Sequence, residues 1–208
     1  MTKFLTVFSG NRRDKDMRKI CIVLVIVLFI IMVWLPVSLA KSTLPPQKQT
    51  VLGLYVTARE AFEMWQADQN KIKIIDVRTP EEYVFVGHPP MAHNIPFQLF
   101  NYKMAVLDKG PLMTPNPNFI AEVGQKFKPS DTILVICRSG NRSAAAVNAM
   151  AAAGFKIAYS VTEGFEGDRV KDPASSSYGK RLKNGWKNSG LPWTDQLNAQ
   201  LMWIPSKP

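Results

Sequence analysis

The stretch TILVICRSGNRSAAAVNAM (residues 132–150) holds the pattern of a strand, a loop and a helix in direct succession. Its opening residues are apolar and largely β-branched, which is typical of a strand buried on both faces. From Arg142 onward it is rich in alanine, the strongest helix former, and Gly154 lies where the helix would end. A buried strand that leads into a helix is the repeating unit of α/β folds.

The sequence on both sides continues this alternation. Thr57 and Glu60 have the spacing of a capping box, so a helix is expected to begin at Ala58. Asn116 followed by Pro117 is expected to open a second helix. The predicted elements are a helix at 58–68, a strand at 71–77, an irregular stretch at 78–97, a helix at 117–126, a strand at 131–136, a helix at 142–153 and a strand at 156–161. Strands that alternate with helices predict an α/β fold with a central, mainly parallel sheet.

Residues 1–40 differ in character from the rest. An unbroken apolar run, ICIVLVIVLFIIMVWL (residues 20–35), follows a basic segment and precedes small residues that end at Ala40. This is the arrangement of a secretory signal, so the segment is predicted to be a signal peptide cleaved after Ala40, or else a retained membrane anchor. A start at Met17 gives a more economical signal. Because the basic flank stays in the cytoplasm, the remainder is expected to be exported to the periplasm.

The rest of the chain fits one domain. Of the 208 residues, 46% are hydrophobic, which is enough for a sizeable core. Residues 41–50 are polar and proline-rich and are predicted to be a linker, followed by the domain at 51–194 and a C-terminal extension at 195–208. The formal net charge is +10, but the basic residues form no long stripe, so no nucleic-acid partner is expected. Only the N-terminal segment is expected to meet the membrane.

Cys137 stands where the predicted strand meets the predicted helix. The other cysteine, Cys21, lies in the predicted signal, so Cys137 has no disulfide partner in a cleaved chain. Backbone N–H groups at a helix N-terminus bind anions, and the helix dipole with Arg138 and Arg142 favours a thiolate over a thiol. The tight loop is permitted by Gly140. The candidate catalytic residue is therefore Cys137, and the candidate anion-binding residues are Arg138, Ser139, Gly140, Asn141, Arg142 and Ser143.

A thiolate that faces an anion pocket suits sulfur transfer. Its attack on the outer sulfur of a thiosulfate-like anion would release sulfite and leave a cysteine persulfide, which a second thiophile such as cyanide or a thiol would then discharge. No cofactor is expected, and no metal, since two histidines with one cysteine lack the spacing of a zinc site. The simpler alternative is that Cys137 is a small buried hydrophobic residue at the end of a strand.

Three motifs resemble those of rhodanese-domain proteins, a family that includes single-domain thiosulfate sulfurtransferases. They are DVRTPEEYVFVGH (residues 76–88), AHNIPF (92–97) and CRSGNRSAAA (137–146). The resemblance covers about residues 51–194 and implies a rhodanese-like fold with helices on both faces of the sheet. It also implies that Cys137 carries the persulfide.

The resemblance further implies that Asp76 and Arg78 form a polar link that supports the edge of the active site. The residues EEY (81–83) are expected to begin a short helix, as packing or solvated residues. The function it implies is an exported sulfurtransferase; the alternative is a sulfur-carrier or partner-binding module that serves another periplasmic protein. Cysteine-dependent phosphatases place the loop arginine one residue further along, at the position of Ser143, whereas here it is Arg142. The shorter loop favours sulfur over phosphate.

Some parts of the chain depart from the family pattern. GHPPMAHNIP (residues 87–96) replaces a small Gly-Ala turn, and its His88 and His93 are expected to be hydrogen-bonding loop residues rather than bases. The polar insertion at 168–183 is predicted to be a solvated loop or, alternatively, a flap over the cysteine. The segment DQLNAQLMWIP (195–205) is expected to form a short helix that docks on the domain.

Overall fold

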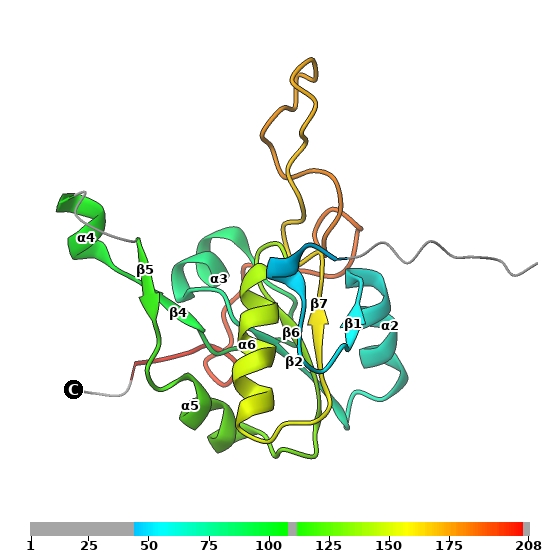
Figure 1. Cartoon of the computed structure of the whole chain (residues 1–208), viewed down its shortest axis with the longest axis vertical. Coiled ribbons are helices and arrows are strands. Elements are labelled where there is room, and N and C mark those ends of the chain that lie inside the picture. Colours follow the sequence, from blue (N-terminus) through cyan, green and yellow to red (C-terminus); the bar gives the residue numbers. More distant parts are fainter. Residues whose placement is uncertain (1–43, 108–111, 206–208) are drawn as a thin grey trace, which may run out of the picture. The chain divides into compact units, whose positions relative to one another are not determined.

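A five-stranded sheet forms the centre of the computed structural model, which describes residues 44–107 and 112–205 (Figure 1). The strands lie in the order β1-β7-β6-β2-β3, and every neighbouring pair is parallel. The sheet consists of β1 (Tyr55–Val56), β2 (Ile72–Asp76), β3 (His93–Asn94), β6 (Thr132–Ile136) and β7 (Ala158–Val161). The predicted α/β fold with a mainly parallel sheet is therefore confirmed.

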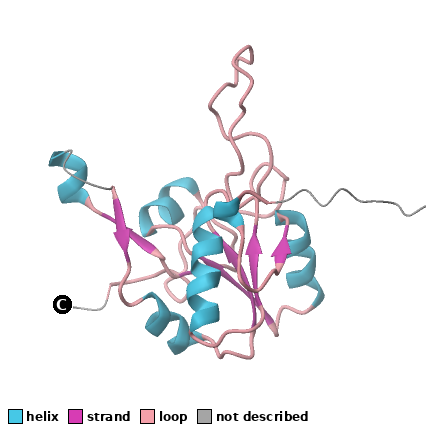
Figure 2. Cartoon of the chain, viewed as in Figure 1, coloured by secondary structure: helices cyan, strands magenta, loops and turns pink. Residues whose placement is uncertain are grey.

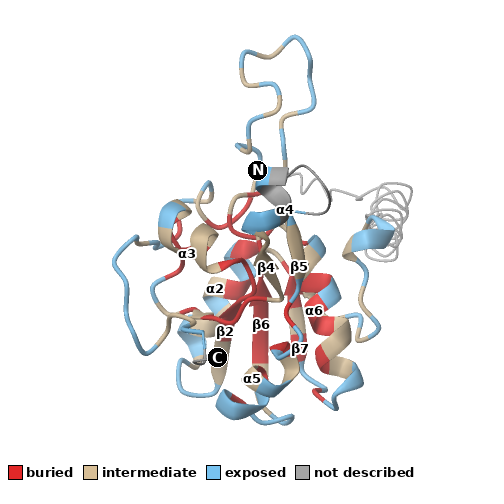
Figure 3. Ribbon diagram, turned by 90° about the vertical axis from the view of Figure 1, so that its left-hand side faces the viewer, coloured by how far each residue is buried: buried red, intermediate tan, exposed pale blue. Residues whose placement is uncertain are grey.

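Helices cover both faces of this sheet (Figure 2). On β6, Ile133 and Val135 pack in the core beneath α5 and α6, whereas Leu134 and Ile136 pack in a second core beneath α2. This alternation follows from the period of two in a strand, and it buries Ile133, Leu134, Val135 and Ile136, the last four residues of β6 (Figure 3). The helices are η1, a 3-10 helix (Pro46–Lys48), α2 (Ala58–Ala67), α3 (Pro80–Val86), α4 (Tyr102–Leu107), α5 (Phe119–Lys126) and α6 (Asn141–Ala152).

Local sequence signals account for most helix ends. The predicted capping box of Thr57 and Glu60 is present at the start of α2. The helix predicted at 117–126 begins later, at Phe119, because the Asn116 side chain accepts a hydrogen bond from the Asn118 N–H and closes a turn before the helix. The short helix expected at 81–83, within the otherwise irregular stretch, is α3, whose capping box pairs Thr79 with Glu82.

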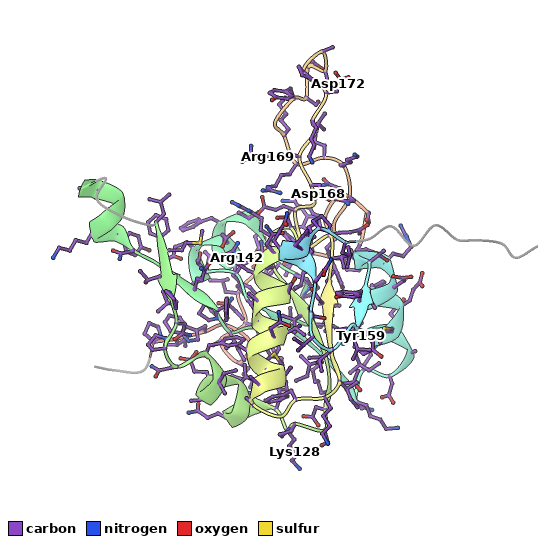
Figure 4. All side chains as sticks on the ribbon, viewed as in Figure 1. Lys128, Arg142, Tyr159, Asp168, Arg169 and Asp172 are labelled. Atoms are coloured by element: carbon purple, nitrogen blue, oxygen red, sulfur yellow. The ribbon has the colours of Figure 1, made fainter. Side chains whose placement is uncertain are left out.

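Two segments of the chain extend away from the central sheet. The antiparallel pair β4 (Gln98–Phe100) and β5 (Met113–Pro115) carries α4 to one side of the domain. The 168–183 loop begins at the edge of the sheet where the strands end and extends away from it, with Asp168 near its base and Asp172 near its far end (Figure 4). Its middle, 171–174, is exposed. The outer part of the loop is therefore solvated and extends away from the sheet instead of folding as a flap over the cysteine, whereas Asp168 and Arg181 at its base are half-buried.

The two ends of the described chain pack differently from expectation. In the stretch predicted to be a linker, η1 packs against α6. Residues 195–205 form turns rather than the predicted helix: the Leu201 carbonyl accepts a hydrogen bond from the Asn94 N–H at the edge of the sheet, and Leu197 is 51% exposed. Within 44–107 and 112–205 there is no helix long and apolar enough to cross a membrane. The predicted signal or anchor at 1–40 lies outside the described residues.

Candidate active site

Cys137 directly follows β6 and is 1% exposed. The Gly140 N–H donates a hydrogen bond to its Sγ at 3.1 Å, and the Ser143 Oγ lies 3.7 Å from the same sulfur. Gly140 is the N-cap of α6, a helix of 12 residues, so this amide lies at the positive end of the helix dipole. The sulfur therefore faces a donor and a partial positive charge, both of which favour an anion at this point.

A second loop holds the cysteine loop in place. Gly140 has a φ of 99°, and a Cβ there would come within 2.1 Å of the Thr162 carbonyl oxygen, so only glycine fits. The Phe165 N–H donates to the Cys137 carbonyl at 2.7 Å, and the Glu166 N–H donates to the Arg138 carbonyl at 2.9 Å. The backbone around the sulfur is thus fixed by the loop that follows β7.

Ser143 ties the loop to the sheet. Its Oγ donates to the Gly140 carbonyl at 2.9 Å and lies 3.1 Å from the Ser160 Oγ on β7. Both serines are fully buried. The other polar residues of the loop are more accessible, since Ser139 is half-buried and Asn141 is exposed. Of the short polar side chains predicted here, Ser143 is the one that contacts the sulfur.

Arg142 is engaged by a carboxylate. Its two terminal nitrogens donate to the two Glu82 oxygens at 2.6 Å each, which joins the first turn of α6 to α3. Burial opposes ionisation of Glu82, but the hydrogen bonds and charge of Arg142 outweigh it and lower the pKa of the carboxyl. The pair is nearly buried, with side chains 13% and 15% exposed. Arg142 therefore brings a compensated charge to the cysteine loop.

Arg138 lies in a different environment. It is half-buried, and its Nε is buried without a hydrogen-bond partner in the described part of the chain. None of the four ion pairs formed within residues 44–107 and 112–205 includes it. Of the two arginines predicted to line the anion pocket, Arg138 is the one whose charge is free.

Asp76 and Arg78 form a fully buried ion pair beside the cysteine loop. The Arg78 Nη2 donates to one Asp76 oxygen at 2.6 Å, and the Arg78 Nε donates to the other at 3.0 Å. Arg78 also donates to the Gly87 carbonyl at 2.7 Å, and its guanidinium lies over the Phe165 ring. Asp76 is opposite Ile136 in the sheet register, one residue before the cysteine. These contacts occupy both carboxylate oxygens of Asp76, which suits a residue that supports the structure of the site.

Neither histidine contacts the cysteine loop through a hydrogen bond in the described structure. The buried His88 stacks on Tyr83, with ring centroids 3.5 Å apart, and its Nδ1 lies 3.0 Å from the Tyr83 carbonyl oxygen. His93 packs edge-on against Phe127. Burial lowers the pKa of both histidines. The residues that the structure describes include no cluster of side chains suited to a metal ion.

Sequence reasoning missed several residues of this site. Glu82 was expected to lie at the start of a short helix as a packing or solvated residue; it does lie in the first turn of α3, but no local signal indicated that it pairs with Arg142. No sequence signal marked Ser160 or Thr162, because their contacts depend on how the loop after β7 folds back. Lys48 was also missed; it donates from the predicted linker to the Thr162 carbonyl at 2.9 Å.

Comparison with known proteins assigns the family. A family model described as a rhodanese-like domain matches residues 59–169, more than half of the chain. The chain belongs to the rhodanese family. The cysteine loop and the Asp76–Arg78 pair both lie within the matched region. Family membership and the sulfurtransferase relatives below support sulfur transfer in general as the activity of this rhodanese.

The relatives extend over most of the domain. Thiosulfate sulfurtransferase 16 of Arabidopsis thaliana is 35% identical over 121 residues, which span 58% of this chain and 78% of the relative. The senescence-associated protein DIN1 of Raphanus sativus is 31% identical over 132 residues, and the match spans 64% of this chain and 66% of that protein. Among solved structures, Rv0390 of M. tuberculosis is 31% identical with a TM-score of 0.54; the match covers 68% of this chain and 96% of that one.

Proposed function

We propose that this rhodanese is an exported sulfurtransferase that moves sulfane sulfur from a thiosulfate-like donor to a thiophilic acceptor through a persulfide on Cys137. The observation that carries the proposal is the contact between the Cys137 Sγ and the Gly140 N–H, 3.1 Å apart at the start of α6. A buried sulfur that accepts a hydrogen bond from a helix N-terminus is suited to an anionic state.

The first step transfers one sulfur atom. The Cys137 thiolate attacks the outer sulfur of thiosulfate and forms a new S–S bond. The bond between that sulfur and the sulfonate sulfur breaks, and sulfite leaves with the electron pair. The product is a persulfide whose terminal sulfur carries the negative charge, which the amides of the 137–142 loop stabilise as an oxyanion hole stabilises an oxyanion.

The second step restores the enzyme. The carbon of cyanide, or the sulfur of a thiolate acceptor, attacks the terminal sulfur of the persulfide. The S–S bond to Cys137 breaks, and its electron pair returns to the cysteine as a thiolate. Neither step changes the number of electrons overall, so no external oxidant or reductant is required.

Export is the second part of the proposal, and it rests on residues 1–40. The apolar run at 20–35 with its basic flank supports transfer of the domain to the periplasm. The mass of the chain recovered from cells tests it. A mature chain that begins at Lys41 in a periplasmic extract supports a cleaved signal, an intact chain in the membrane fraction supports an anchor, and an intact chain in the cytosol contradicts export.

The activity is tested with the full chain in mild detergent, with thiosulfate as donor and cyanide as acceptor, beside Cys137→Ser. We expect thiocyanate production by the wild type to be lost in the variant. Incubation with thiosulfate alone should add about 32 Da to the wild type and nothing to the variant. Equal rates for the two proteins overturn the enzyme proposal. A persulfide that forms without cyanide turnover instead favours the sulfur-carrier alternative.

A further inference from the structure

The cysteine loop carries two arginines but only one uncompensated positive charge. Glu82 compensates Arg142 through two hydrogen bonds of 2.6 Å, which leaves Arg138 as the uncompensated arginine of this loop. Thiosulfate, the donor proposed above, carries two negative charges. A second uncompensated cation near Arg138 would balance the second negative charge of thiosulfate, and the 168–183 loop supplies such a cation.

Arg181 reaches back from that loop to Gly167, a residue of the segment that holds the cysteine loop. Its Nη1 donates to the Gly167 carbonyl at 2.6 Å, and the N–H of Gly167 donates in turn to the Arg138 carbonyl at 3.2 Å. Asn188 holds the Arg181 backbone by donating to its carbonyl at 3.2 Å. Arg181 is half-buried, unlike Leu182 and Lys183, which are exposed. One end of its guanidinium is therefore bound to Gly167, the same residue that donates to the Arg138 carbonyl.

The surroundings of Arg181 are positive. Burial and, next, the nearby charge of Arg138 lower the pKa of Arg181, and Arg169 adds to the effect, whereas Glu166 and Asp168 oppose it. Asp168 is engaged elsewhere, by Lys48 at 3.1 Å and Asn184 at 3.2 Å. No ion pair in the described ranges includes Arg138, Arg169 or Arg181. Guanidinium groups held close together without a bound carboxylate are stabilised when an anion binds between them.

We infer that Arg181 and Arg138 together form the binding site for the doubly charged sulfur oxyanion, with Arg181 as the second cation that Arg142 does not provide. The inference rests on the proposed function, because it names the residue that binds the donor of that reaction. Arg181 lies outside the region matched by the family model, which ends at residue 169. The insertion thus adds a specificity residue to the shared cysteine loop.

The role of Arg181 is to bind the sulfonate end of the donor, whose charge is retained as sulfite leaves. An interaction present in both the bound donor and the transition state affects KM more than kcat. In the full chain, Arg181→Gln is expected to raise the KM for thiosulfate roughly tenfold, the loss of one charged hydrogen bond, with kcat little changed. In the same variant, the KM for a singly charged aryl thiosulfonate should rise less than the KM for thiosulfate.

Lys183→Gln is the matched control, because it removes one positive charge from an exposed position of the same loop. It should leave both KM values near those of the wild type, and Arg181→Lys should restore part of the thiosulfate affinity. An equal KM change in Arg181→Gln and Lys183→Gln overturns the inference, since charge alone would then explain it. An equal rise in KM for thiosulfate and for the thiosulfonate in Arg181→Gln also overturns the inference.

A binding measurement separates this inference from the proposed activity. Sulfite is expected to protect Cys137 from alkylation by iodoacetamide, a neutral reagent, and Arg181→Gln should raise the sulfite concentration needed for half-protection, whereas Lys183→Gln should not. If the wild type turns over no thiosulfate but Arg181→Gln weakens protection, the activity is wrong and the anion site stands. If protection is the same in all three proteins, the anion site is wrong.

Discussion

At the scale of single residues, the contact between Glu82 and Arg142 sets the character of the cysteine loop. The carboxylate takes two charged hydrogen bonds of 2.6 Å from the guanidinium and connects α3 to the first turn of α6. It orients the helix whose N-terminal amide donates to the Cys137 sulfur. Arg142 is therefore a positioning residue in this structure, and the free charge beside the cysteine belongs to Arg138.

Removal of the Glu82 charge should destabilise the domain, because Arg142 depends on this carboxylate as its partner. In Glu82→Gln, Arg142 stays nearly buried without an anionic partner, so we expect a loss of about 2 kcal/mol in the free energy of unfolding. Chemical denaturation of the full chain in mild detergent measures it. Glu63→Gln, a neutralisation at an exposed position of α2, is the control and should change stability by less than about 0.5 kcal/mol. Similar losses in both variants would contradict the role assigned to the pair.

At the scale of elements, η1 acts as a strap that holds the cysteine loop against the domain. It packs against α6, and Lys48 at its end donates to the Thr162 carbonyl at 2.9 Å and pairs with Asp168. The Thr162 carbonyl is the group that leaves no room for a Cβ at Gly140. The contacts therefore run from the strap through Thr162 to the residue whose amide reaches the sulfur.

Lys48→Met keeps the side-chain stem and removes the ammonium group. The Thr162 carbonyl then loses a donor, so we expect a loss of about 1 kcal/mol in stability and a roughly tenfold lower turnover, since small displacements of a catalytic loop are costly. Lys71→Met is the matched control, because Lys71 is 84% exposed and pairs only with Asp68 at the surface. Turnover that is unchanged in Lys48→Met would show that the strap does not position the loop.

At the scale of the whole domain, the site lies where the strands of a two-sided sheet end. β2 and β6 lie side by side, so their last residues bring Asp76 next to the cysteine loop. The same parallel arrangement requires long connections between strands, and those connections bury polar groups. His88 lies in one of them, between α3 and β3, and His93 is the first residue of β3. Their burial couples the stability of the domain to pH.

The sign of this coupling follows from the lowered pKa of His88 and His93. Below the ordinary histidine pKa of about 6.5, the unfolded chain binds protons that the folded chain does not, so stability falls as pH drops through that value. We expect the thermal midpoint to decrease between about pH 7.5 and 5.5. In the double variant His88→Asn, His93→Asn the thermal midpoint should decrease less over that pH interval, whatever the absolute stability of the variant. An equal decrease in both proteins would assign the coupling to other groups.

Much of the fold could be predicted from local patterns. The strands β2, β6 and β7 lie in segments where apolar and β-branched residues predominate, and the Thr57–Glu60 capping box places the start of α2. The short strands β1 and β3 could not be predicted, because two residues carry no periodicity and pair only when neighbouring strands are present. The predicted helix at 195–205 is replaced by turns: the N–H groups of Leu201 and Met202 both donate to the Asn198 carbonyl, and the Leu201 carbonyl bonds to the sheet edge instead of to a following helical turn.

For the candidate site, the sequence by itself determined the candidate nucleophile, the loop length and the glycine that the loop requires, since these depend on residues adjacent in the chain. Only the tertiary structure decided which charges are free, because electrostatic compensation depends on distance in space. Glu82 lies far from Arg142 in sequence yet neutralises it, whereas Arg181 comes from an insertion that had the composition of a plain solvated loop. Pairing of charges between distant segments leaves no local pattern, and here it determines which arginines are available to an anion.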